Sequence, residues 1–260
     1  MLINVKNLKS YKLKGIDQEF GSIREFYFDD KFWTIRYLVA NTGTWLNKKP
    51  VLISPYFLEN INPDHGVINV NLTRKQVEDS PSPDNDKPVS RQFEERYYDY
   101  YGVPAYWGGP SMWGPVPNLV RDREQWKNMK TEEKSWDTDL RSTKDVSGHV
   151  IHATDGDIGK VDDFIVDDDT WAIRYFVVDT KKLIPGREVL VSPQWITDIS
   201  WEDSKVTIDL SREVIRNAPE FDPDEFLTRE HEKRLWDYYN RQGYWTDETY
   251  VGEYSRHGEL

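Results

Sequence analysis

The sequence contains no cysteine, and cationic side chains are in the minority. A disulfide scaffold, a thiolate metal site and a cysteine nucleophile are therefore excluded. The chain has 34 Lys and Arg residues against 46 Asp and Glu residues, which gives a formal net charge of -12. A chain this acidic argues against nucleic acid as a partner, because phosphate binding needs a cationic surface.

Long hydrophobic runs are also missing. None approaches the roughly 20 residues needed to span a bilayer, and the first residues show neither an apolar signal segment nor a small-residue cleavage site. We therefore expect a soluble cytoplasmic protein without a membrane span, and peripheral association with a membrane stays open. Hydrophobic residues make up only 37% of the chain, but aromatic residues reach 14%. Because a buried ring removes about 150–250 Å² from water, these aromatics predict a folded chain.

The chain matches itself at an offset of 138 residues, without a gap, from about residue 10 to residue 107. We interpret this match as an internal duplication. Its signature consists of the following residues of the two copies: Trp33, Arg36, Tyr37, Ser54 and Pro55, matched by Trp171, Arg174, Tyr175, Ser192 and Pro193. The predicted organisation is a first unit with an aromatic helical tail (1–107), a Gly/Pro-rich and charged linker (108–140), a second such unit (141–245) and a polar C-terminal tail (246–260).

Each copy shows β-strand patterns first and helical patterns last. Residues 22–28 and 33–41 predict a hairpin, with Trp33, Ile35, Tyr37 and Val39 on one face of its second strand. Residues 51–54 and 67–72 predict further strands, which favours a small barrel or sandwich over a parallel α/β sheet. Thr73 and Gln76 predict a capping box, while Ser211 retains only the cap. A second helix is expected to start near Ser90 in the first copy and near Thr228 in the second.

Four blocks in fixed order carry a family resemblance: FYFDD or FIVDDDTW, then IRYLV or IRYFVVDT, a loop, and VLISP or VLVSP. Both copies resemble the PRC-barrel family. The resemblance implies a six-stranded, SH3-like barrel, as in the cytoplasmic domain of the photosynthetic reaction centre H subunit. The predicted fold is all-β with short helical tails, in which two tandem small PRC barrels form an internal pseudo-dimer.

Acidic residues crowd the start of the second copy. Carboxylate oxygens suit Ca²⁺ or Mg²⁺, but the spacing of a calcium loop and its closing glutamate are missing. We therefore expect solvated turn residues and no bound metal. The weak metal candidates are Asp155, Asp157, Asp167, Asp168 and Asp169.

Catalytic signals are poor. His149 and His152 lie three residues apart without a carboxylate partner at a recognisable spacing, and Ser54 and Ser192 lack the nucleophile elbow. No phosphate-binding glycine loop is present. We predict that the protein is not an enzyme and needs no cofactor. Arg36 and the matching Arg174 are expected to form structural ion pairs with the turn residues Asp29 and Asp167.

The aromatic tails are the best functional surface in the sequence. Exposed aromatics would anchor a protein partner, whereas buried ones would clamp one copy on the other, which we favour. The residues concerned are Tyr97, Tyr98, Tyr101, Tyr106, Trp107, Trp113, Trp236, Tyr239, Tyr244 and Trp245.

We predict a non-enzymatic interaction or assembly module. The reaction-centre resemblance implies a place beside a membrane or electron-transfer complex. The alternative is a small-ligand or cation sensor that uses the acidic turns. Two oligomeric states stay open, a monomer with internal pseudo-symmetry and a homodimer.

Overall fold

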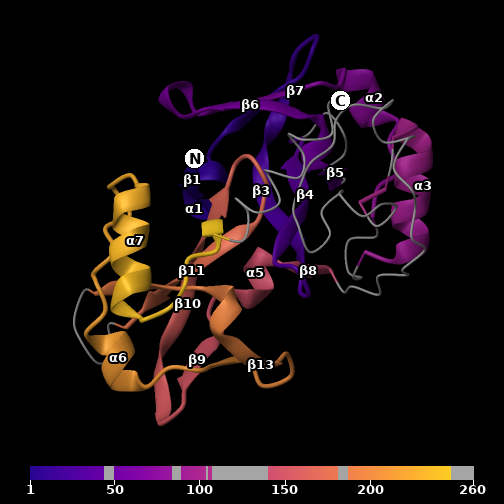
Figure 1. Cartoon of the computed structure of the whole chain (residues 1–260). Helices are drawn as coiled ribbons and strands as arrows, with labels where there is room; N and C mark the ends of the chain where they lie inside the picture. The colour runs from indigo at the N-terminus through magenta and orange to yellow at the C-terminus, as the bar shows by residue number, and fades with distance from the viewer. Residues whose placement is uncertain (44–49, 84–88, 104, 107–139, 181–186, 247–260) are drawn as a thin grey trace, which may run out of the picture. The chain divides into compact units, whose positions relative to one another are not determined.

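The computed structural model describes residues 1–43, 50–83, 89–103, 105–106, 140–180 and 187–246 (Figure 1). The chain divides into two compact units. The first contains Met1, residues 3–147 and residues 166–174, and the second contains Leu2, residues 148–165 and residues 175–260. Strands dominate both units and the helices are short, so the all-β class is confirmed. The four-part organisation expected from the sequence stays a prediction.

The sheet of the first unit follows the order β5-β4-β3-β2-β7-β6, and β8 pairs with β3. Its strands are antiparallel except for β2 and β7, which run parallel. The elements are β1 (Leu2–Asn4), α1 (Val5–Leu8), β2 (Lys12–Lys14), β3 (Glu19–Asp29), β4 (Thr34–Asn41), β5 (Val51–Ile53), η1 (Pro55–Phe57), β6 (Leu58–Asn62), η2 (Pro63–His65), β7 (Val67–Val70), α2 (Arg74–Glu78), α3 (Arg91–Tyr101), β8 (Leu140–Ser142) and α5 (Thr143–Val146).

The main path of the second sheet, β12-β11-β10-β9-β14-β13, has the corresponding order. Here β9 and β14 run parallel, as β2 and β7 do. The elements are β9 (Val150–Ala153), β10 (Gly156–Asp167), β11 (Ile173–Asp179), β12 (Glu188–Val191), η3 (Pro193–Trp195), β13 (Ile196–Ser200), β14 (Lys205–Ile208), α6 (Arg212–Arg216) and α7 (Arg229–Tyr238).

The helix starts follow the predicted capping residues. Thr73 and Gln76 form the complete capping box of α2, and Ser211 caps α6 through its side chain alone. Ser90 accepts from the N–H of Phe93 at the start of α3, and Thr228 accepts from that of His231 at the start of α7. Each cap satisfies an N–H group that has no partner inside the helix. These local predictions are confirmed.

The hairpin of β3 and β4 differs from its prediction at the turn. Trp33 lies outside β4 with a φ of 52°, and its N–H donates to the carbonyl of Asp29 at 3.1 Å. Trp171 has the same role, with a φ of 60° and a bond of 2.7 Å to the carbonyl of Asp167. The predicted strand start at Trp33 is therefore wrong, because the turn needs a left-handed residue there.

The alternation expected along β4 does not appear as a difference in exposure, because residues 34–40 are all buried. Tyr37 packs edge-on against Tyr97 of α3, with ring centroids 5.3 Å apart. Arg36, which comes from the other face in the predicted pattern, lies 4.3 Å from the centroid of the Tyr106 ring. The helical tail therefore covers side chains of both kinds, and α3 lies beside β4 and β5 (Figure 1).

Two matched glycines allow neighbouring strands to approach closely. A Cβ on Gly21 would collide with the carbonyl oxygen of Asn41, and one on Gly159 would collide with that of Asp179. Gly21 also has a φ of +134°, which side chains with a Cβ rarely adopt.

Candidate functional site

The predicted ion pairs between strand arginines and turn aspartates are present. Arg36 Nε lies 2.5 Å from Asp29 Oδ2, with both side chains at most 1% exposed. A guanidinium nitrogen of Arg174 lies 2.9 Å from Asp167 Oδ2, and these side chains are 8% and 16% exposed. Burial raises the pKa of Asp29 although Arg36 opposes the rise. Burial has the same tendency at Asp167, but Arg174 and the neighbouring hydrogen bonds outweigh it and lower the pKa. Both pairs hold the turn of a hairpin.

Helix α3 of the first unit carries a buried glutamate. The carboxylate of Glu94 is 2% exposed, accepts a hydrogen bond from Tyr37 Oη at 2.9 Å and lies 3.2 Å from Arg91. Burial raises the pKa of Glu94 to about 7, against the opposing effects of Arg91, Tyr106, Tyr37 and Arg36. The side chain can therefore exchange a proton near neutral pH.

Helix α7 of the second unit carries a second buried glutamate, 138 positions after Glu94. Glu232 accepts hydrogen bonds from Tyr175 Oη at 2.7 Å and Tyr244 Oη at 2.8 Å. Its other oxygen lies 2.9 Å from Arg229. Trp236 Nε1 donates to Tyr175 Oη at 2.7 Å, so a chain of hydrogen bonds runs from the indole to the carboxylate. These contacts attach α7 to the start of β11.

The sequence analysis missed both glutamates. A signal was available, because glutamate stands at both of two positions 138 residues apart, each inside an aromatic stripe and three residues after an arginine. Charged residues are rarely fully buried unless they are paired. The prediction considered only the aromatic residues of the stripe and therefore overlooked the paired glutamate among them.

The predicted aromatic residues that the structure describes lie mostly inside the units. Tyr97, Tyr98, Tyr106, Trp236, Tyr239 and Tyr244 are buried, and Tyr101 and Trp245 are partly exposed. Trp107 and Trp113 lie outside the described residues.

Their contacts join each helix to a sheet of the same unit. The N–H of Ser54 donates to Tyr97 Oη at 2.9 Å, and Tyr239 Oη donates to the carbonyl of Leu190 at 3.2 Å. The sequence analysis expected a clamp between the two copies. That clamp stays a prediction. The contacts seen here fasten a helix to the end of a strand in the same unit, because a phenol hydroxyl can satisfy a backbone group there.

The serines of the signature have a structural use. Ser54 follows β5 and caps η1, and Ser192 follows β12 and caps η3, each accepting from an N–H two residues later at 3.3 Å. Pro55 and Pro193 occupy the first position of these turns, where a missing N–H costs nothing.

The acidic candidates divide into two groups. Asp155 accepts from the N–H of Arg212 at 2.7 Å at the start of α6. Asp157 lies 2.6 Å from His152 Nδ1, and this bond lowers the pKa of the carboxyl. No sequence spacing had indicated this pair of a histidine and a carboxylate. The antiparallel register of β9 and β10 brings the two residues opposite each other, although they lie five positions apart.

The second acidic group lies at the turn between β10 and β11. Carboxylate oxygens of Asp167, Asp168 and Asp169 lie within 4.8 Å of one another. Arg174 already pairs with Asp167, and the amino group of Met1 pairs with Asp168. Cations of the chain itself therefore balance two of these three carboxylates.

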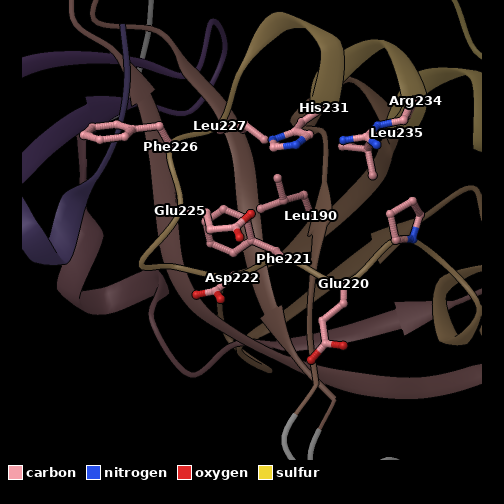
Figure 2. A pocket seen from close by; sticks show the side chains of 11 residues that line it. Leu190, Glu220, Phe221, Asp222, Glu225, Phe226, Leu227, His231, Arg234 and Leu235 are labelled. Carbon is pink, nitrogen blue, oxygen red and sulfur yellow. The ribbon is translucent and has the colours of Figure 1, made fainter.

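A groove of about 340 Å³ lies beside helix α7 in the second unit. Its floor is apolar, formed by Leu190, Phe221 and Leu235, all at most 7% exposed. Phe226 lies at one end of the groove with 73% of its surface exposed (Figure 2). This groove was not predicted from the sequence. The prediction concentrated on residues shared at the offset of 138, and Glu220 and Phe221 align there with Ser82 and Pro83.

Charged side chains surround this floor. Glu220 and Asp222 lie on the side away from α7, while His231 and Arg234 project from α7 itself (Figure 2). Glu225 also lines the groove, so the lining contains three carboxylates and one permanent cation. An apolar floor with polar groups at its edge is the usual composition of a binding pocket.

No curated protein matches the chain. Among the described residues, no helix is both long enough and apolar enough to cross a lipid bilayer.

Residues 149–215, from the residue before β9 to the fourth residue of α6, match the family model of the PRC-barrel domain.

Proposed function

We propose that the protein is a non-enzymatic interaction or assembly module built on a duplicated PRC barrel. The observation that carries this proposal is the groove beside α7, an apolar floor with an exposed phenylalanine and a charged edge. Large aromatic side chains beside an apolar pocket are typical of protein interfaces. The PRC-barrel match of residues 149–215 supports the same class of function.

Reciprocal backbone contacts support the duplication and the internal pseudo-dimer. Within the first compact unit, the N–H of Ile35 donates to the carbonyl of Trp171 at 2.8 Å. The N–H of Ile173 donates to the carbonyl of Trp33 at 2.7 Å. Ile173 lies 138 residues after Ile35, and Trp171 lies 138 residues after Trp33. Under the proposed duplication, the two hydrogen bonds are therefore equivalent. This exchange is the pattern of an isologous contact.

The non-enzymatic part of the proposal rests on the use of the candidate groups. Ser54 and Ser192 cap short turns, and Arg36 and Arg174 hold aspartates of the hairpin turns. The partner is proposed to be a protein of a membrane or electron-transfer complex, as the resemblance to the reaction-centre subunit implies.

Chemical cross-linking of the tagged full chain in native lysate, followed by mass spectrometry, tests this function. The proposal expects the same protein partner in repeated captures, with cross-links to residues 219–235. Captures no richer than those of a tag-only control would contradict it.

A cation or small-ligand sensor is the second candidate, favoured by the three clustered carboxylates at residues 167–169. The measurement is the melting temperature with excess Ca²⁺ or Mg²⁺ and with EDTA. Because Arg174 and Met1 already neutralise two carboxylates, we expect changes below about 1 °C, which corresponds to a few tenths of a kcal/mol. A shift of several degrees that Asp169→Asn abolishes would favour the sensor.

A further inference from the structure

We propose that the groove beside α7 binds a protein segment in which a large apolar side chain stands next to lysine or arginine. This inference rests on the interaction function proposed above and names the chemistry of the partner. It assigns the apolar side chain to the floor of the groove and the neighbouring cation to the carboxylates at its edge.

The floor suits a bulky side chain. Its volume of about 340 Å³ lies at the lower end of the range of roughly 300–1,000 Å³ for ligand pockets. Such a space holds an aromatic or branched side chain rather than a large cofactor. Phe226 is the most exposed of the large hydrophobic side chains among the described residues. Covering its ring with a partner would remove apolar surface from water, which is the main driving force of association.

The floor is already formed without a partner. The N–H of Phe221 donates to the carbonyl of Glu188 at 2.9 Å, and Val189 and Glu220 form a β-bridge. The segment that carries the acidic edge is therefore attached to β12 by backbone hydrogen bonds. A preformed site avoids much of the ordering cost of binding.

The charges at the edge select the sign of the partner. Glu220, Glu225 and Arg234 form no ion pair with any other described residue, and Asp222 accepts from the N–H of Asp224 at 2.9 Å. Three carboxylates against one guanidinium leave the edge negative, in a chain whose net charge is -12. Complementary charge favours a cationic segment and disfavours an acidic one.

Fluorescence polarisation of the full chain with three labelled synthetic peptides tests the proposal. The peptides are GSKWKSG, GSEWESG and GSKAKSG, which separate the apolar requirement from the cationic one. We expect saturable binding of the first peptide and at least about tenfold weaker binding of the other two. Equal binding of all three, or no binding of the first, would overturn the proposal.

Variants of the groove locate the binding. Phe226→Ser should weaken binding of GSKWKSG by about tenfold, and Glu225→Gln by about two- to fivefold. Their matched controls are Ile16→Ser, which removes a side chain that is 64% exposed in the first unit, and Glu230→Gln, which removes an exposed charge outside the groove. The controls should leave binding unchanged. Loss of binding in the controls, or none in the groove variants at unchanged melting temperature, would refute the assignment.

Two further measurements separate this inference from its rivals. Sedimentation equilibrium tests a second copy as the occupant, and a dimer that Phe226→Ser dissociates would overturn the heterologous partner.

Repeating the lysate capture with Phe226→Ser distinguishes failure of the groove assignment from failure of the proposed interaction function. Undiminished capture of the same partner leaves the interaction function intact and refutes the groove. Loss of that capture, together with binding of GSKWKSG, supports both.

Discussion

Glu94 and Glu232 occupy corresponding positions on helices α3 and α7, but the residue four positions later differs between them. In the second unit it is Trp236, whose indole N–H donates to Tyr175 Oη at 2.7 Å. Because an indole can only donate, the Tyr175 hydroxyl must direct its own proton to Glu232. In the first unit the position holds Tyr98, which can donate or accept. The pKa of Glu94 is raised to about 7.

This difference shows how a single replacement changes a polar network without changing the fold around it. Both helices begin at a capped N-terminus, and both carry an arginine three residues before the glutamate. The two helices therefore begin in the same way, although the C-cap residue is Gly102 in α3 and Tyr239 in α7. In the second unit, Trp236 fixes the direction of the hydrogen bonds because it can only donate. In the first unit, Tyr98 can donate or accept, so its residue type does not fix their direction.

Among substitutions at matched positions, the largest difference in the loss of stability is expected at the two arginine–aspartate pairs. Arg36→Leu should lower the free energy of unfolding by about 3–5 kcal/mol, because it leaves a buried, unpaired aspartate. Arg174→Leu should cost less, about 1–3 kcal/mol, because Asp167 remains accessible to water. Chemical denaturation of the two variants measures both values. Equal losses would mean that burial does not distinguish the two pairs.

The second-largest difference in stability loss is expected between alanine substitutions of the two glycines at which strands approach closely. Gly21→Ala is expected to cost about 2–4 kcal/mol, because it combines a collision with a left-handed φ. Gly159→Ala meets only the collision and should cost about 1–3 kcal/mol. Thermal unfolding of both variants provides the comparison. A smaller effect for Gly21→Ala would contradict the role given to its dihedral angle.

The buried Glu94 predicts a pH dependence of the free energy of unfolding. Glu94 binds its proton more tightly in the folded chain, since its pKa rises from an ordinary 4.5 to about 7. Its contribution to stability is therefore present near pH 5 and is lost as the pH rises through 7. From about pH 5 to pH 8 this loss amounts to about 2–3 kcal/mol.

Denaturation curves across this pH range test the prediction. Glu94→Gln should remove the loss. A wild-type slope in Glu94→Gln would place the titrating group elsewhere.

The smallest effects serve to test the equivalence of the two helices. Tyr100 Oη donates to the carbonyl of Gln76 at 3.0 Å, and Tyr238 Oη donates to that of Val214 at 2.7 Å. Tyr100→Phe and Tyr238→Phe should each cost about 0.5–1 kcal/mol, because each removes one neutral hydrogen bond. Losses that differ by more than about 1 kcal/mol would show that the helices dock differently, as measured by the same denaturation assay.

Local features were predictable because their causes lie within a few residues. The caps at Ser90, Thr73 and Thr228 follow from side-chain oxygens that accept from nearby N–H groups. The pair of Arg36 and Asp29 joins two strands of one hairpin, so proximity in sequence was enough to predict it.

Other features depend on contacts that no local pattern contains. The left-handed turn at Trp33 follows from the geometry of the hairpin, which overrides the high β-propensity of tryptophan. The pair of His152 and Asp157 depends on strand register, and the groove depends on how residues 219–227 return beside β12 and α7.

The sequence by itself determined the repeated pattern of strands, the helix starts and the absence of thiol chemistry, because each follows from residue type and short-range spacing. The tertiary structure decided which side chains meet. It buried aromatic residues of helices α3 and α7 against sheets of the same units, buried Glu94 and Glu232 on these helices, and left Phe226 exposed beside an apolar floor. The physical reason is that burial and hydrogen-bond partners are set by chain segments far apart in sequence, which composition and periodicity cannot bring together.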